Sequence, residues 1–248
     1  AGDAPATNSS RPTDAQDALT PDSTGNYQGD IIITATKRSQ TLSEVPIAVS
    51  AVTGDQLRNS GAVDIRALNQ LSPSLLVSSA SAETSGAARI RGIGTVGENP
   101  GLESSVATFI DGVYRSRTGV GLSELGGVER IEVLRGPQGT LFGRNASAGL
   151  ISITTLRPKF DIGGYASASY GNYNAIRLEG GVTGGITDKV AARLDGVYFK
   201  RDGFIENVID GRDVNNRDRW LLRGKVLVEP NDDVSILLIG DYSSRSEE

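Results

Sequence analysis

The last third of the chain alternates apolar and polar residues with a period of two. Successive side chains of a β-strand point to opposite faces, so this pattern predicts strands with one apolar and one polar face. About five strands follow one another between Gly163 and Glu248, each roughly ten residues long. Four of them carry their apolar positions at Ile176, Leu178, Gly180, Val182 and Ile186; Val190, Ala192, Leu194, Gly196 and Tyr198; Trp220, Leu222, Gly224, Val226 and Val228; and Val234, Ile236, Leu238 and Tyr242.

Two kinds of sheet explain this alternation. Ten residues is the length that a tilted strand needs to cross a bilayer, and outer-membrane barrels alternate short turns with long loops. The turns at 187–189 and 230–233 are short and the link 202–219 is long, whereas the turn at 171–174 is short on the long-loop side. A soluble antiparallel sheet with one wet face alternates equally well. Aromatic residues gather on the long-loop side, as in an interfacial girdle: Tyr170, Tyr173, Tyr198, Phe199, Trp220 and Tyr242.

The middle of the chain, residues 39–157, mixes short strands and helices between glycine-rich turns. Thr53-Gly54-Asp55 is typical of a helix start, and a helix through Ser60 is predicted there. A second helix is predicted over 63–71. The domain is therefore expected to be α+β, with a small mixed sheet. Its strands are predicted at 45–52, 75–77, 88–91, 107–110, 130–134 and 150–154.

The first 30 residues are rich in Ala, Ser, Thr, Asp and Pro and offer little apolar surface to bury, so we expect a disordered tail. At Ile31 the composition changes to a β-branched run, Ile31 to Thr36, followed by Lys37-Arg38. Such a run forms a strand that can pair with another sheet edge. The alternative is that it is simply the first strand of the domain that follows.

Composition limits the function classes. The chain of 248 residues has a net charge of -5, so it lacks the basic surface of a nucleic-acid-binding protein. It has no Cys and no His, which removes disulfides, thiolate metal sites and the commonest general base. No catalytic, metal or cofactor site is predicted. No apolar run reaches the roughly 18 residues of a membrane helix. The start at Ala1 without an apolar export core favours a removed signal peptide.

Residues 129–154 read ERIEVLRGPQGTLFGRNASAGLISIT. This segment closely resembles the end of the plug domain in TonB-dependent outer-membrane receptors, where a strand, an Arg-Gly-Pro turn, a glycine-rich hairpin and a final strand recur. Residues 45–52, 89–94 and 108–114 resemble earlier plug segments, in the same order. With the run at Ile31, the resemblance covers roughly residues 31–248.

The resemblance implies an α+β plug domain, a mixed small sheet with short helices, followed by antiparallel transmembrane β-barrel strands. About 5 of about 22 strands are present, so the barrel is expected to be incomplete and the chain to be a fragment or a portion of a longer product. The implied domains are a periplasmic tail at 1–30, a TonB-box segment at 31–38, the plug at 39–157 and the first barrel strands at 158–248.

The resemblance also implies a function: active transport of a scarce substrate, most often a ferric siderophore, across the bacterial outer membrane. Its implied partners are TonB with the ExbB/ExbD energising complex, outer-membrane lipid and an extracellular small molecule or chelate. Nothing in the sequence separates a siderophore from cobalamin, haem or an oligosaccharide. The alternative is a soluble periplasmic or secreted binding module; an enzyme is not expected.

Particular residues follow from the resemblance. The TonB box would be Ile31, Ile32, Ile33, Thr34 and Ala35, a short strand able to add to a partner's sheet edge. Arg91 and Arg135 would meet carboxylates on the inner barrel wall, with Glu179 as a candidate. Substrate contacts are expected in the loops 95–105 and 114–121, where folding or solvation is the competing role for each residue. The candidates are Asn99, Glu103, Tyr114, Arg115 and Arg117.

Overall fold

The computed structural model describes residues 32–33, 40–41, 45, 47–61, 67–78, 86–95, 103–116, 125–208 and 211–246. The chain divides into two compact units, 1–45 and 46–248. In the first unit, β1 (Ile32–Ile33) pairs antiparallel with β2 (Gln40–Thr41), and Ile33 stands opposite Gln40. The β-branched run therefore forms a strand at Ile32 and Ile33. The tail predicted over 1–30 lies outside the described residues.

The second unit begins with a small α+β domain, whose central sheet has the strand order β3-β9-β10-β7-β8. Strands β7 and β10 are parallel and the other neighbours are antiparallel, so the sheet is mixed, as predicted. Apolar residues from both ends of this domain form one core, including Val52, Leu68 and Ile131. The strands are β3 (Val49–Thr53), β7 (Val106–Ile110), β8 (Val113–Arg115), β9 (Val128–Arg135) and β10 (Gly149–Thr155).

Helix α1 (Gly54–Asn59) begins where the sequence predicts it, because Thr53 is its N-cap. The Thr53 hydroxyl accepts a hydrogen bond from the Gln56 amide at 3.3 Å, and the Thr53 amide donates to Gln56 Oε1 at 3.0 Å. This reciprocal capping box satisfies two amides at the helix start. The remaining elements are α2 (Leu68–Leu71), α4 (Gly139–Phe142) and a three-stranded sheet of β4 (Leu75–Ser78), β5 (Ala87–Ile90) and β6 (Ile93–Gly94).

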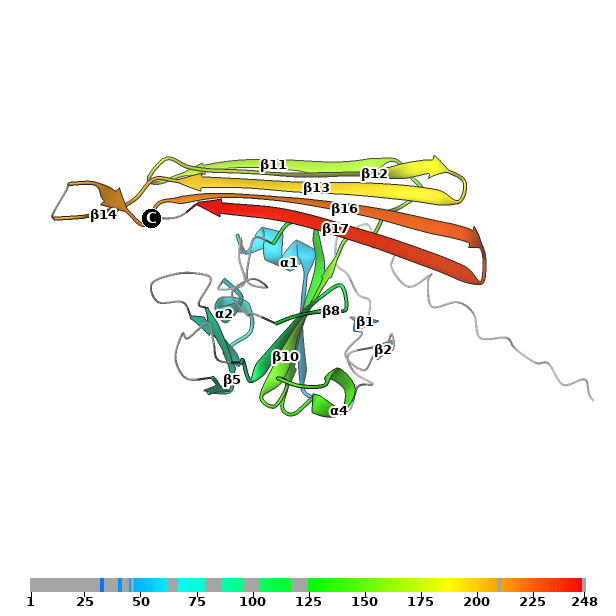
Figure 1. Ribbon diagram of the computed structural model, residues 1–248, viewed down its shortest axis with the longest axis horizontal. Helices are drawn as coiled ribbons and strands as arrows, with labels where there is room; N and C mark the ends of the chain where they lie inside the picture. Colours follow the sequence, from blue (N-terminus) through cyan, green and yellow to red (C-terminus); the bar gives the residue numbers. More distant parts are fainter. Residues whose placement is uncertain are drawn as a thin grey trace, which may run out of the picture. The chain divides into compact units, whose positions relative to one another are not determined.

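After β10 the chain enters a second sheet of five long antiparallel strands in the order β11-β12-β13-β16-β17, drawn from yellow-green to red in Figure 1. These strands lie where the alternation predicts them, and within the described residues they form an open sheet. A small hairpin, β14 (Ile205–Glu206) with β15 (Asp213–Val214), occupies the long link. The long strands are β11 (Gly163–Gly171), β12 (Ala175–Thr187), β13 (Val190–Arg201), β16 (Arg217–Asn231) and β17 (Val234–Ser246).

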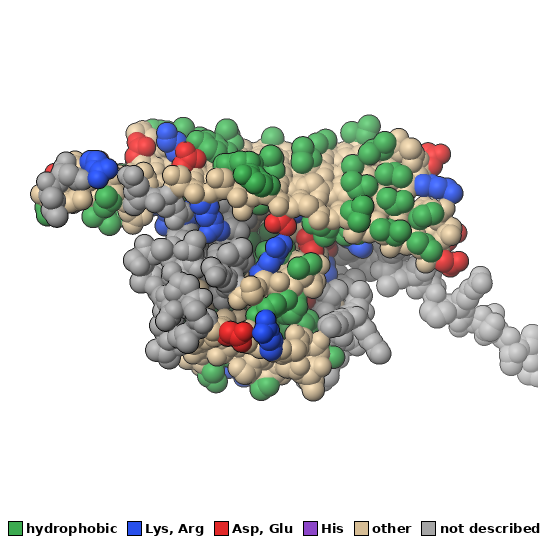
Figure 2. All heavy atoms as spheres, viewed as in Figure 1, with side chains coloured by type: hydrophobic (Ala, Val, Ile, Leu, Met, Phe, Trp, Pro, Cys, Tyr) green, Lys and Arg blue, Asp and Glu red, His purple; other side chains and the backbone are tan. Residues whose placement is uncertain are grey.

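The two faces of the long-strand sheet are inverted relative to a soluble sheet. The face that contacts the small domain, here called the inner face, holds buried charged and polar side chains. The outer face exposes apolar side chains, some of which are visible in Figure 2. A water-soluble antiparallel sheet would bury the apolar face instead. Exposed on the outer face are Ile176, Leu178, Val182, Ile186, Leu194, Leu222, Ile236 and Leu238; buried on the inner face are Arg177, Thr183, Arg193, Asp195, Arg219, Arg223 and Lys225.

This inversion decides between the two interpretations of the alternation, because outer-membrane barrel strands point apolar residues to lipid and polar residues inward. The fold is thus an α+β domain followed by antiparallel strands of the barrel type. Among the described residues, no helix is long and apolar enough to cross a membrane.

Candidate functional site at the inner face

The first contact between the inner face and the small domain involves a backbone segment, Leu125 to Gly127. Arg177 Nη2 donates a hydrogen bond to the Leu125 carbonyl at 3.4 Å, and Arg223 Nη1 donates to the Gly126 carbonyl at 3.2 Å. Both guanidinium groups are buried. Charged donors form stronger hydrogen bonds than neutral ones, so two cations on consecutive carbonyls hold this segment firmly against the sheet.

Gly127 permits this close approach. Its φ is +59°, and a Cβ built on it would lie 2.7 Å from Asp195 Oδ1. Any L-residue here would therefore meet both backbone strain and the carboxylate of a neighbouring strand. Gly127 therefore lets the backbone of the small domain lie directly against Asp195 of the inner face.

Asp195 is held rigidly by its own sheet. Arg193 on the same strand binds it in a bidentate manner, with Nε to Oδ2 and Nη2 to Oδ1 both at 2.7 Å. The Tyr165 hydroxyl lies 3.4 Å from Asp195 Oδ1 and 3.2 Å from Glu179 Oε1. Arg177 completes the network by donating to Glu179 Oε2 at 3.1 Å. Every charge in this network has an opposite partner, as burial requires.

A second contact anchors the turn between β7 and β8. Asp111 adopts φ +49° in this turn and accepts hydrogen bonds from the Thr155 amide at 2.8 Å and the Thr155 hydroxyl at 2.6 Å. Lys225 Nζ lies 3.2 Å from Asp111 Oδ2 and donates to the Thr155 carbonyl at 3.1 Å. The end of β10, the β7–β8 turn and strand β16 therefore meet at a single buried ion pair.

A third contact comes from β8. Arg115 Nη2 lies 3.0 Å from Asp241 Oδ1 on β17. Both side chains are about one-third exposed or less, so this pair is better shielded than an ordinary surface salt bridge. Residues of the small domain thus reach β12, β13, β16 and β17.

Three residues are predicted to join plug and barrel: Arg91, Arg135 and Glu179. Arg135 donates to the carbonyls of Ala48 and Val49, both at 3.4 Å and both inside the small domain. Arg91 is an exposed turn residue with φ +53°. Glu179 pairs with Arg177 on its own strand. Their role between the two parts of the fold stays a prediction. Most of the described contacts between the small domain and the long strands run from cations on the strands to backbone carbonyls and to Asp111 of the small domain.

The predicted substrate residues fall into two groups. Glu103 pairs with Arg144 at 3.3 Å, and the Tyr114 hydroxyl accepts a hydrogen bond from Asn145 Nδ2 at 2.7 Å. Glu103 and Tyr114 therefore contact two residues that are neighbours in the sequence. Arg115 instead lies at β17. Asn99 and Arg117 lie outside the described residues.

Of the predicted TonB box, Ile32 and Ile33 form β1, while Ile31, Thr34 and Ala35 lie outside the described residues.

The sequence did not single out the residues that join the small domain to the inner face, here called the seat: Asp111, Arg177, Arg223, Lys225 and the glycine pair 126–127. One signal was available, because Arg223 and Lys225 are two cations at alternate positions of a predicted strand and therefore share one face. Asp111 lies in the motif 108–114 and could have been singled out as a carboxylate in a tight turn. Its partner, however, is on a strand more than a hundred residues later.

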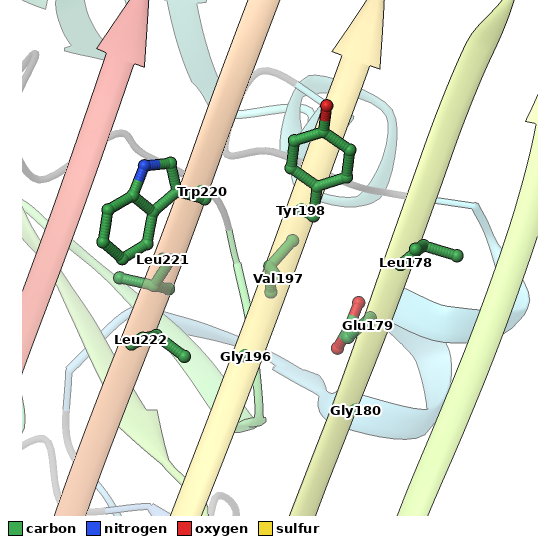
Figure 3. Close-up of a pocket in the computed structure, with 9 residues that line it drawn as sticks. All are labelled: Leu178, Glu179, Gly180, Gly196, Val197, Tyr198, Trp220, Leu221 and Leu222. Atoms are coloured by element: carbon green, nitrogen blue, oxygen red, sulfur yellow. The ribbon is translucent and has the colours of Figure 1, made fainter.

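The outer face carries a shallow apolar groove of about 390 Å³ (Figure 3). Gly180 and Gly196 stand opposite each other on β12 and β13 and form its floor. Leu178 and Leu222 flank this floor, and Tyr198 stands opposite Trp220 at one end. Such a lining offers few polar groups to orient a polar ligand, so the groove is suited to hydrocarbon.

Comparisons with known proteins agree with this architecture. The family model for the TonB-dependent receptor plug domain matches residues 41–150. The pesticin receptor of Yersinia pestis is 26% identical over 76% of this chain and 27% of its own length. The ferrioxamine B receptor of Salmonella typhimurium is 31% identical over 66% of this chain and 23% of its own length. The chain therefore spans about a quarter of these relatives.

Solved structures show the same fold. The ferric yersiniabactin uptake receptor of Yersinia pestis superposes with a TM-score of 0.74 at 22% identity, over 79% of this chain and 31% of that one. The ferripyoverdine receptor of Pseudomonas aeruginosa gives a TM-score of 0.72 at 22% identity, over 86% of this chain and 27% of that one. At this identity the likeness concerns the fold.

Proposed function

We propose that this chain is the plug and the first barrel strands of a TonB-dependent receptor that imports a scarce chelate across the bacterial outer membrane. The match of residues 41–150 to the plug-domain family model supports this proposal. The observation that carries the proposal is the seating of the small domain on a charged inner face whose reverse side is apolar. A sheet of this kind separates lipid from a polar interior, and the seated domain closes that interior.

The energy for transport would come from TonB, driven by ExbB/ExbD, acting on Ile31 to Ala35 in the periplasm. Within this segment, Ile32 and Ile33 already form a strand, paired with β2. A short strand with this pairing tendency can add to the sheet edge of a partner, either along its second edge or by exchanging β2 for the partner strand.

The substrate would be a ferric siderophore or a similar chelate. This proposal is supported by the relatives, which are receptors for ferrioxamine B, ferric yersiniabactin and ferripyoverdine. Glu103, Tyr114 and Arg115, together with Asn99 and Arg117, remain the candidate contacts on the plug. Of these candidates, Glu103 and Tyr114 contact Arg144 and Asn145, whereas Arg115 pairs with Asp241.

Uptake of radioactive iron tests the proposal. The full-length receptor is expressed in cells that lack their own siderophore receptors, with and without a functional TonB. We expect a ferric chelate from a siderophore panel to accumulate only when both proteins are present, and the receptor to sediment with outer membranes. Accumulation that is independent of TonB would contradict the proposal, as would recovery of the receptor in the soluble periplasmic fraction.

The alternative, a soluble binding module, predicts partition into buffer without detergent. The exposed leucines, isoleucines and valines of the outer face weigh against it, because soluble monomers rarely expose contiguous apolar areas of that kind.

A further inference from the structure

Arginines stand directly opposite one another at the end of the long-strand sheet that carries the β14–β15 link. Arg201 on β13 is the register partner of Arg217 on β16, and Arg219 on β16 is the register partner of Arg245 on β17. Directly opposite residues of an antiparallel pair have Cα atoms about 4.5–5.5 Å apart. Like charges at that separation destabilise a sheet.

All of these arginines belong to the inner face. Arg217 and Arg219 lie an even number of residues from Arg223, which contacts the small domain, and the register of β13 with β16 is regular over this stretch. Arg245 lies four residues after Asp241, which binds Arg115 of the small domain on the same face. The four strand arginines and Arg115 therefore border one region, beside β8.

The burial of these arginines and their unsatisfied donor atoms support a binding site in this region. Arg219 is only 2% exposed. The Nε atoms of Arg115 and Arg201 are buried and have no hydrogen-bond partner among the described residues. Arg201 donates through Nη2 to Asn215, and Arg115 binds Asp241; Arg217, Arg219 and Arg245 also have contacts within the protein. A ligand would add to these contacts or exchange with them.

Guanidinium groups are suited to oxyanions, because their planar donor pairs match carboxylate and phosphate oxygens. Several of them on adjacent register positions match a ligand with several such oxygens. The position of the region is also suitable for a ligand that arrives from outside the cell, since it lies at the sheet end opposite the short turns at 188–189 and 232–233. In the proposed orientation, that end faces the outside of the cell.

We propose that Arg115, Arg201, Arg217, Arg219 and Arg245 form a binding site for a polyanionic ferric chelate, whose carboxylate or catecholate oxygens lie between the opposed arginines. The inference rests on the proposed transport function and names the charge class of its substrate. The plug contributes Arg115 and the barrel contributes the other four, so the site is complete only when the plug is seated.

Binding measurements on the full-length receptor in detergent test this site. The probes are ferric citrate and a ferric tris-catecholate, both anionic, with cationic ferrioxamine B as the contrast. We expect at least one anionic chelate to bind more tightly than ferrioxamine B, with an affinity that falls as salt rises. The double variant Arg219→Gln/Arg245→Gln should weaken that binding at least tenfold, and Arg219→Lys/Arg245→Lys should restore part of it.

Two controls keep the result interpretable. Arg58→Gln removes an exposed arginine that pairs with Asp55 on α1 and should leave binding unchanged. The single variant Arg201→Gln, at a partly exposed position, reports on the site if the double variant fails to fold by thermal melting.

The inference is overturned if no anionic chelate is preferred, or if neither Arg219→Gln/Arg245→Gln nor Arg201→Gln changes its binding while the receptor remains folded. TonB-dependent uptake of ferrioxamine B, together with no uptake of either anionic chelate, would also overturn it while leaving the transport function intact. Absence of TonB-dependent uptake of every chelate would instead remove the transport function itself.

Discussion

Lys225 of β16 and Asp111 of the β7–β8 turn form an ion pair with 3.2 Å between Nζ and Oδ2. The Lys225 side chain is 1% exposed and that of Asp111 is 9% exposed. The same carboxylate accepts two hydrogen bonds from Thr155, where the last plug strand ends. One carboxylate therefore joins a turn, a strand end and a barrel strand, and removing it affects all three.

Asp111→Asn should loosen the plug. The change leaves Lys225 buried without its counter-charge, which costs about 3–5 kcal/mol in comparable buried pairs. We expect a lower melting temperature of the full-length receptor and a higher permeability of cells to large antibiotics. Asp188→Asn, at an exposed turn, is the matched control and should change neither measurement. A double-mutant cycle with Lys225→Gln should show strong coupling; additive effects would mean that the pair does not hold the plug.

Gly127→Ala should weaken the contact between the plug and the inner face through a change on the plug. The alanine would have to adopt φ +59° and would place its Cβ 2.7 Å from the Asp195 carboxylate. The left-handed conformation alone costs about 1–2 kcal/mol, and the carboxylate must also move. Gly139→Ala is the control, because a Cβ there meets nothing within 4 Å. Equal melting temperatures for the two variants would show that the approach at Gly127 is not tight.

Val182→Arg tests whether the outer face contacts lipid. Val182 is 56% exposed in the middle of β12, whereas Ile186 is 67% exposed next to the turn. In a membrane barrel an arginine costs about 2–4 kcal/mol at mid-bilayer and about 0–1 kcal/mol near the interface. Folding into lipid vesicles should thus be impaired much more by Val182→Arg than by Ile186→Arg. If the face were in water, both variants would fold like the wild type.

Ile33→Pro should abolish TonB binding, measured by calorimetry with the full-length receptor. Proline removes an amide that a strand ladder needs and so prevents β1 from adding to a partner's sheet edge. Ile33→Val keeps both the amide and a β-branched side chain, and should bind normally. Unchanged binding of the proline variant would place the TonB box elsewhere.

Much of this fold could be predicted from local patterns. The helix start at Thr53 follows from side chains that cap their own neighbours, and the long strands follow from alternation along each segment. The motif at 129–154 was also readable, because its turns depend on glycines and a proline within a few residues. These features need no distant partner, so the sequence alone carries them.

The contacts of the candidate site were harder to predict from the sequence. The resemblance implies a contact of Arg135 with the barrel wall, which stays a prediction. The hydrogen bonds of Arg135 to the carbonyls of Ala48 and Val49 depend on strand pairing, which brings these distant residues alongside. Which cation meets which carbonyl across two parts of a fold depends on their docking. No local pattern contains that information.

Which residues share a face of each long strand follows from the sequence, because side chains alternate with a strict period of two. Which face is covered follows from the three-dimensional packing, since that depends on where the plug lies. The packing placed Arg177, Arg223 and Lys225 under the plug and left Leu178 and Val182 exposed. It also set Arg219 opposite Arg245, because register depends on turn lengths and bulges across the whole sheet.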